Sequence, residues 1–343
     1  MSGSETADVP HILLGEPFVL EVHAPDFVRE KTGNLARTED CRFSPNGKKL
    51  AMAGFAKNAI VIFNVDLKSG DGAPQLSLTD YVELTSEVLN HPHGLDFVDD
   101  KTLVIGNRGG SVVVFQVPDP TPDQKQIVQP PLLTITKADF FNKLNSPGSV
   151  CVTDSGPEFY EILVCNNYNH RVTQHSVSRG VGHRVTSNRI LLENRLKIPD
   201  GVAQSVNRHL FAISNHLTHE VFIYRTEAKN GRRTLPHGVL KGVDFPHGLR
   251  FFGDDRYILV ADAGLPFSRL YFCADGKWEG EYRPIKSIRV MPDETFLKGR
   301  SNTQEGGLKG LDFSPCGQIL ATTCEMQPLV FYDAERLLKA AAG

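Results

Sequence analysis

The sequence predicts an all-β fold in which six similar units, each a small antiparallel sheet, close into a ring. Three observations support this prediction. The 343 residues include 30 Gly and 21 Pro, a density that a long helical bundle cannot absorb, because both residues break helix interiors. Short apolar runs rich in Val, Ile, Phe and Tyr recur between turn-forming residues. A common pattern also recurs six times along the chain.

Each repeat opens with a short polar segment that leads into a first strand. The six openings are Glu39–Phe43, His93–Phe97, Pro147–Cys151, Asp200–Gln204, His247–Phe251 and Lys309–Phe313. Their first residues lie 54, 54, 53, 47 and 62 positions apart. Turns such as Ser44–Gly47 and Ser314–Gly317 follow these strands and supply the Pro, Asn and Gly that tight hairpins need.

Two further strands are expected in every repeat, and a fourth in five of the six. The second strands are Lys49–Ala53, Thr102–Gly106, Glu161–Cys165, Leu210–Ser214, Tyr257–Ala261 and Ile319–Thr323. The third are Ala59–Phe63, Ser111–Phe115, Arg171–His175, Glu220–Tyr224, Arg269–Phe272 and Leu329–Tyr332. The fourth are Gln75–Leu84, Leu132–Thr136, Arg189–Glu193, Thr234–Leu240 and Arg283–Val290.

The sixth repeat lacks a fourth strand, since only a short helical tail, Ala334–Ala342, follows it. Phe18–His23, between Pro17 and Pro25, can supply that strand and close the ring. The expected fold is therefore a single-domain six-bladed β-propeller. Its blades are 36–88, 89–143, 144–196, 197–243, 244–305 and 306–335, the last completed by 15–24. A short surface helix is expected at Lys137–Leu144.

Composition excludes several classes of function. Lys and Arg number 37 against 40 Asp and Glu, and no basic block offers a surface for nucleic acid or acidic membranes. No apolar run is long enough to span a bilayer. The first ten residues do not form a secretory signal, and the six Cys include no CxxC pair. We therefore expect a cytoplasmic protein with a small-molecule partner.

Three of the openings carry a resemblance. Pro92–Phe97, Pro199–Val202 and Pro246–Phe251 resemble the P-[ND]-G-Φ openings of the senescence marker protein and gluconolactonase family, whose relatives include paraoxonases and strictosidine synthases. The resemblance implies that the residue before each Gly faces a central channel, where Glu, Asn and Asp hold one divalent metal. The matching positions are Glu39, His93, Pro147, Asp200, His247 and Lys309. Glu39 and Asp200 keep the family's ligand types, whereas His93 stands where Asn is usual.

The residues alone lead to a similar hypothesis. Because the six positions share one place in the repeat, a closed ring brings them around one axis. Glu39, His93, Asp200 and His247 are ordinary metal ligands, and two imidazoles with carboxylates suit zinc, iron or manganese better than calcium, which stays possible. Glu39 and Asp200 are also the candidate catalytic carboxylates. Alternatively, these polar residues cap turns, and the two imidazoles are hydrogen-bonded within the channel.

A second set of polar residues follows the second strands. If it rises to the same face as the channel positions, it can bind substrate; Asn and Asp also favour such loops for backbone reasons alone. Lys309 could orient an anionic group or offset the charge of the acids. His216 and His219 lie on loops without a shared axis and are weaker candidates. The candidate substrate-binding residues are Asn107, Arg108, Asn166, Asn215, Asp262 and Lys309.

These residues favour a metal-dependent enzyme. The resemblance implies lactone or ester hydrolysis, and the same site would serve an isomerase or lyase that acts through an enolate or oxyanion. Two alternatives stay open. One is a non-catalytic propeller that binds a protein or peptide on its loop face. The other is a metal-free synthase resembling strictosidine synthase, with Glu39 or Asp200 as its base.

Overall fold

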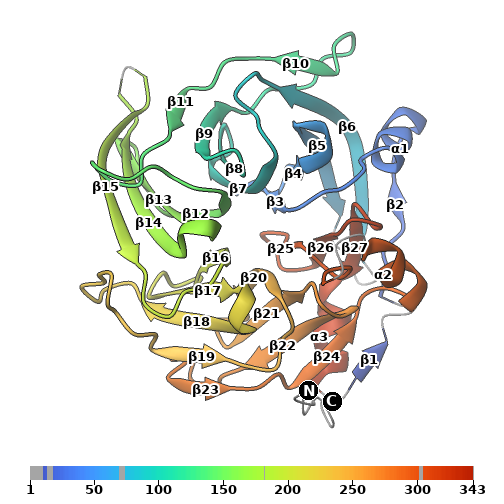
Figure 1. The fold of residues 1–343 in the computed structure, drawn as a ribbon. Helices are drawn as coiled ribbons and strands as arrows, with labels where there is room; N and C mark the ends of the chain where they lie inside the picture. The colour runs from blue at the N-terminus through green and yellow to red at the C-terminus, as the bar shows by residue number, and fades with distance from the viewer. Residues whose placement is uncertain (1–10, 14–17, 69–73, 181, 301–303, 343) are drawn as a thin grey trace.

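Six small sheets surround a central axis in the computed structural model, which describes residues 11–13, 18–68, 74–180, 182–300 and 304–342 (Figure 1). This arrangement confirms the expected six-bladed β-propeller. The innermost strand of each blade is the first strand of a repeat. These strands are β3 (Cys41–Phe43), β7 (Pro92–Asp99), β12 (Pro147–Ser155), β16 (Pro199–Gln204), β20 (Pro246–Phe252) and β25 (Gly310–Phe313).

From the inner strand, each blade runs outward through antiparallel neighbours, as predicted. The second strands are β4 (Lys49–Gly54), β8 (Thr102–Asn107), β13 (Phe159–Asn166), β17 (Leu210–Asn215), β21 (Tyr257–Asp262) and β26 (Ile319–Thr323). The third are β5 (Ala59–Lys68), β9 (Ser111–Gln116), β14 (Arg171–Ser178), β18 (Glu220–Arg225), β22 (Phe267–Phe272) and β27 (Val330–Asp333). The fourth are β6 (Gln75–Thr85), β11 (Leu133–Ile135), β15 (Arg184–Leu192), β19 (Gly238–Leu240) and β24 (Lys286–Arg289).

The N-terminal segment closes the ring. Val19 forms an antiparallel bridge with Tyr332 of β27. The backbone N–H of Leu20 donates to the carbonyl of Phe331 at 2.9 Å, and that of Asp333 donates to Phe18 at 2.8 Å. Phe18–Leu20 therefore completes the sixth blade, as predicted, while residues 15–17 of the expected strand lie outside the described residues. The chain continues as β2 (Val22–His23), which pairs with β6.

Three short strands that we did not predict extend the outer edges of blades. β10 (Gln126–Val128), from the connection between β9 and β11, pairs with β6 of the preceding blade. β23 (Gly280–Tyr282) pairs with β19, and β1 (His11–Leu13) pairs with β24. All three pairings are parallel. They cover strand edges that would otherwise present unpaired N–H and C=O groups, and β10 and β23 also tie neighbouring blades together.

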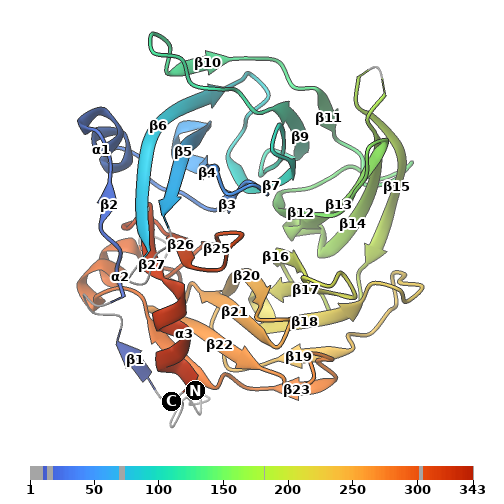
Figure 2. The same ribbon diagram turned by 180° about the vertical axis from the view of Figure 1, so that it is seen from behind.

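Helices are short and peripheral. The predicted tail forms α3 (Ala334–Ala342), which lies against the outer part of the sixth blade (Figure 2). α1 (Asp26–Gly33) and α2 (Asp293–Gly299) occupy connections between blades. The helix expected at Lys137–Leu144 was wrong, because the Asp139 carboxylate accepts the backbone N–H groups of Phe141 and Asn142 at 2.8 and 2.7 Å and bends the chain. Within the described residues, no helix has the length and apolar character to cross a membrane.

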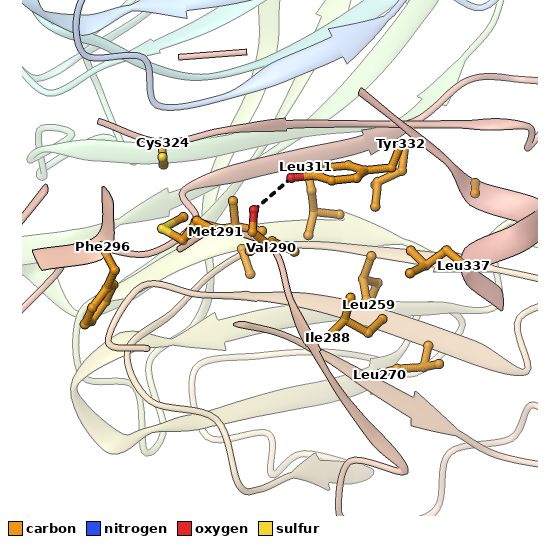
Figure 3. Close-up of a cluster of buried hydrophobic side chains, with 14 residues drawn as sticks. Leu259, Leu270, Ile288, Val290, Met291, Phe296, Leu311, Cys324, Tyr332 and Leu337 are labelled. Atoms are coloured by element: carbon orange, nitrogen blue, oxygen red, sulfur yellow. Dashed lines mark hydrogen bonds between the residues drawn. The ribbon is translucent and has the colours of Figure 1, made fainter. Parts of the chain in front are cut away.

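The hydrophobic core lies between neighbouring blades. Figure 3 shows one such cluster, in which Leu259 and Ile288 of the fifth blade pack near Leu311 and Tyr332 of the sixth. The buried Tyr332 hydroxyl donates to the carbonyl of Val290 at 2.9 Å, which satisfies its polar end. Because the inner strands pack on both faces, their sequences show little polar–apolar alternation.

Candidate functional site

The start of the first strand has the same register in four blades. Pro92, Pro147, Pro199 and Pro246 pair with Asn107, Asn166, Asn215 and Asp262, respectively, at the end of the second strand. The residue after each Pro therefore occupies the equivalent channel position. In the third blade this residue is Gly148, so the expected placement of Pro147 there was wrong by one position. The irregularity after Pro147 spans one residue fewer than that after Pro92, and the sequence alone does not reveal this.

The other two blades follow the same geometry without a Pro. The backbone N–H of Glu39 donates to Ala53, and that of Lys309 donates to Thr323, at 3.1 and 2.9 Å. The channel positions are therefore Glu39, His93, Gly148, Asp200, His247 and Lys309, in blade order. The five side chains among them are all buried.

Gly148 gives the third blade a special role. A Cβ at this position would lie 2.1 Å from Oδ1 of Asn167 and 2.3 Å from Oδ1 of Asp200. The absence of a side chain thus makes room for both. The carbonyl of Gly148 accepts a hydrogen bond from Nδ1 of His93 at 2.6 Å. At its channel position the third blade therefore contributes a backbone carbonyl that binds His93, and it leaves room for the side chains of Asn167 and Asp200.

Hydrogen bonds fix the tautomers of the two channel histidines. Since a carbonyl can only accept, Nδ1 of His93 carries the proton; the guanidinium of Arg108 can only donate, and its Nη2 lies 2.9 Å from Nε2 of His93. Nδ1 of His247 donates to Oδ2 of Asp200 at 2.8 Å. Both Nε2 atoms therefore carry lone pairs. This pattern, in which the outer ring nitrogen is held by a carbonyl or carboxylate, is typical of histidines that bind metals.

Three acceptor atoms converge inside the channel. The ligand atoms of Glu39, His93 and His247 all lie within 4.8 Å of one another. Oε2 of Glu39 is 3.2 Å from Nε2 of His93, although both atoms are acceptors. Oε2 of Glu39 and Nε2 of His247 are buried and have no hydrogen-bond partner among the residues that the structure describes. Buried acceptors without a donor are costly, so this group fits a bound cation.

The surrounding charges favour the ionised carboxylates. Burial alone would raise the pKa of Glu39, but surrounding cations, including Lys309 and Arg37, outweigh it and hold the pKa well below its usual range. Burial would also raise the pKa of Asp200. The hydrogen bond from His247 and the charge of Arg108 outweigh this effect and hold the pKa well below the ordinary value. Burial lowers the pKa of His247 despite the adjacent Asp200. The channel thus holds anionic carboxylates beside a neutral imidazole.

A second group adjoins the first and shares His247. Ligand atoms of His216, His247 and Glu305 also lie within 4.8 Å of one another. Nε2 of His216 donates to Oε1 of Glu305 at 2.8 Å, and Lys309 forms an ion pair with the other carboxylate oxygen. From the sequence, His216 is only a weaker candidate, whereas the structure brings it into this second group. The sequence did not reveal Glu305 or Arg37 as site residues, because both lie outside the repeated pattern. Arg37 forms an ion pair with Glu39.

A cavity of about 650 Å³ opens above these groups. Of the predicted substrate-binding residues, Arg108 lines this cavity. Lys309 is buried in the channel below it, where it pairs with Glu305. Asn167 and His216, each directly after a predicted Asn, also line the cavity.

Asn107, Asn166, Asn215 and Asp262 are fully buried and do not line this cavity. Each accepts a backbone N–H from the loop that leads into its own blade. The donors are Asn90, Asn145, Lys197 and Asp244, at 3.2, 3.2, 2.6 and 3.2 Å, respectively. This repeated contact favours the loop-stabilising role that the sequence left open beside substrate binding.

No protein-family model matches the chain, and no curated protein matches it. The six-bladed fold agrees with the resemblance noted in the sequence, whereas the comparisons give no support to the specific family.

Proposed function

We propose that this protein binds one divalent metal ion through Glu39, His93 and His247 and acts as an enzyme on a small molecule. The observation that carries the proposal is the convergence of three acceptor atoms, two of them buried and without a donor in the described part of the chain. A divalent cation is the simplest group that satisfies all three at once. One carboxylate and two imidazoles favour zinc, iron or manganese, with calcium less suited to nitrogen ligands.

Asp200 takes a positioning role in this proposal. The sequence predicts it as a fourth ligand and as a catalytic carboxylate. Its Oδ2 accepts from His247, however, and its Oδ1 accepts from Asn167 at 2.9 Å, with Arg108 at 3.4 Å. A carboxylate so engaged orients His247 and strengthens it as a ligand. Glu39 is the carboxylate that faces the two Nε2 atoms, and so the better candidate for direct binding.

The reaction we propose is hydrolysis of a lactone or ester, or an isomerisation or elimination through an enolate. When bound, a divalent cation would polarise a carbonyl oxygen and acidify a water molecule. Arg108 lines the cavity and can stabilise negative charge on a substrate oxygen. The hydrogen-bonded pair of His216 and Glu305 also lines it and is suited to move a proton.

Metal analysis of the protein purified without chelator tests the proposal. We expect about one zinc, iron or manganese per chain, and a rise in melting temperature when the metal is added to metal-free protein. His93→Gln and His247→Gln should abolish both effects. His237→Gln is a matched control, because His237 stands in the same Pro-His-Gly tripeptide but lies beside outer strand β19. Wild-type protein that neither contains nor binds metal would contradict the proposal.

The protein-binding alternative has one observation in its favour. Phe140 and Phe141 are 84% and 90% exposed, and their rings contact each other at a centroid distance of 5.0 Å. Such exposure is unusual for two adjacent aromatic residues. If this surface carries the function, Phe140→Ser with Phe141→Ser will abolish it and leave metal content unchanged. The metal-free synthase alternative predicts activity that survives chelation.

A further inference from the structure

We propose that the substrate of this site is a small organic carboxylate, which Arg108 holds while the metal is bound. The inference rests on the proposed function, because it requires a metal at Glu39, His93 and His247. It starts from the position of Arg108, directly after β8. The guanidinium lies 2.9 Å from Nε2 of His93 and lines the cavity, with its side chain 21% exposed.

The metal and Arg108 cannot share His93. Nε2 of His93 offers a single lone pair, which Arg108 uses in the structure, and a metal ligated by His93 would need the same lone pair. A metal ion bound to Nε2 of His93 and the guanidinium of Arg108, which lies 2.9 Å from the same atom, would also repel each other. Metal binding therefore leaves Nη2 of Arg108 without its closest partner and available to an incoming anion.

The remaining contacts of Arg108 are longer than its hydrogen bond to His93. Asp200 lies 3.4 Å from Nη2, and this carboxylate already accepts shorter hydrogen bonds from His247 and Asn167. The hydroxyl of Ser146 lies 3.3 Å from Nη1. Neither contact is as short as the 2.9 Å bond to His93. A released Arg108 thus has donors for a ligand in the cavity.

The charge of the site also favours an anion. Before any metal binds, the carboxylates of Glu39, Asp200, Glu305 and Glu325 face the cations Arg37, Arg108 and Lys309, four against three. Arg37 pairs with Glu39, and Lys309 pairs with Glu305. A divalent metal would leave one excess positive charge in a largely buried site. An anionic ligand would offset that excess.

The cavity indicates an organic anion. At about 650 Å³ it lies within the size range of small-molecule sites and far exceeds the volume of a simple ion. Phe55, Tyr168 and Ile198 line it beside the polar groups and can contact an apolar part of the ligand. The planar donors of a guanidinium match a carboxylate, and the hydroxyl of Ser146 stands next to them.

Calorimetric titration of metal-free protein with Zn²⁺ or Mn²⁺ tests this inference. The titrations are run alone and with acetate, benzoate, succinate, phosphate or sulfate at constant ionic strength. We expect organic carboxylates to tighten metal binding at least about 5-fold, the lower end of ordinary coupling between sites. Arg108→Gln should lose this tightening. It should also bind metal without carboxylate at least as tightly as wild type, because the competing cation is gone.

Two further variants sharpen the test. Arg108→Lys keeps the charge without the planar pair of donors and should retain only part of the coupling. Arg184→Gln, the same substitution at an exposed position of β15, should behave as wild type. Melting curves check that each variant is folded.

The outcomes separate the two proposals. Metal binding that no carboxylate changes, or a carboxylate effect that persists in Arg108→Gln, overturns the inference and leaves the metal site standing. Coupling to phosphate or sulfate in place of carboxylates overturns the substrate class. A wild-type protein that binds no metal under any condition contradicts the proposed function itself.

Discussion

The carboxylate of Asp200 accepts a hydrogen bond from Nδ1 of His247 across 2.8 Å, and the two residues begin the inner strands of neighbouring blades. Nδ2 of Asn167, from the third blade, donates to the other oxygen of Asp200 at 2.9 Å. The orientation of His247 therefore depends on three consecutive blades. Because Nδ1 is held in this way, Nε2 is directed to Glu39 and His93.

Asp200→Asn should weaken metal binding about 10- to 100-fold, the usual effect of losing a group that orients a histidine ligand. Calorimetric titration with Zn²⁺ measures the change. Asp244→Asn is a matched control, because Oδ1 of Asp244 lies 2.7 Å from Nδ1 of His219 in a pair that is more than one-third exposed and outside the cavity. Equal affinity in Asp200→Asn and wild type would remove Asp200 from the site.

Gly148→Ala should disrupt the site through sterics alone. The new Cβ would lie closer than 2.5 Å to oxygen atoms of Asn167 and Asp200, so these side chains must move. We expect a loss of unfolding free energy of roughly 1–3 kcal/mol and weaker metal binding. Chemical denaturation and metal titration report the two effects. Gly156→Ala, in the same blade, meets its nearest atom only at 3.6 Å and should change neither. Wild-type metal affinity in Gly148→Ala would contradict this account.

The fold was largely predictable because its signal is repeated. Turn residues, strand lengths and the strand missing from the sixth blade all follow from composition and spacing, and Phe18–Leu20 closes the ring as expected. β10 and β23 escaped prediction because each is a three-residue strand paired with a distant edge. Such pairing depends on tertiary contacts and not on local sequence.

The site was predictable only where it coincides with the repeat. Glu39, His93, Asp200 and His247 were found because they share one position in successive units. Glu305 was missed because it lies in a long connection with no counterpart in other blades.

The Asn that ends a second strand drew attention by its repetition, yet its side chain serves the loop. The variable residue after it, such as Arg108 or His216, faces the cavity.

His175 should make stability depend on pH. Burial lowers the pKa of this imidazole to about 4, from an unfolded value near 6.5. As pH falls below 6.5, the unfolded chain takes up a proton that the folded protein refuses, so stability decreases until about pH 4. The loss amounts to roughly 3 kcal/mol. His175→Gln should flatten the dependence of unfolding free energy on pH in this window, as measured by denaturation. His209→Gln, at a largely exposed position, should not. Identical slopes in wild type and His175→Gln would refute the assignment.

Removal of residues 1–23 should destabilise the whole ring. Phe18, Leu20 and Val22 pack against buried clusters, and Phe18–Leu20 supplies the outer strand of the sixth blade. At about 1 kcal/mol for each partly buried side chain and each of two backbone hydrogen bonds, the loss is roughly 5 kcal/mol before the pairings of β1 with β24 and of β2 with β6 are counted. This is comparable with the total stability of many domains, so a large fall in melting temperature is expected. A synthetic peptide of residues 15–24, added to the shorter protein, should restore part of the stability, because it can rebuild the strand beside β27. A truncated protein that melts like wild type would mean that three strands suffice for the sixth blade and that the ring needs no closure from the N-terminus.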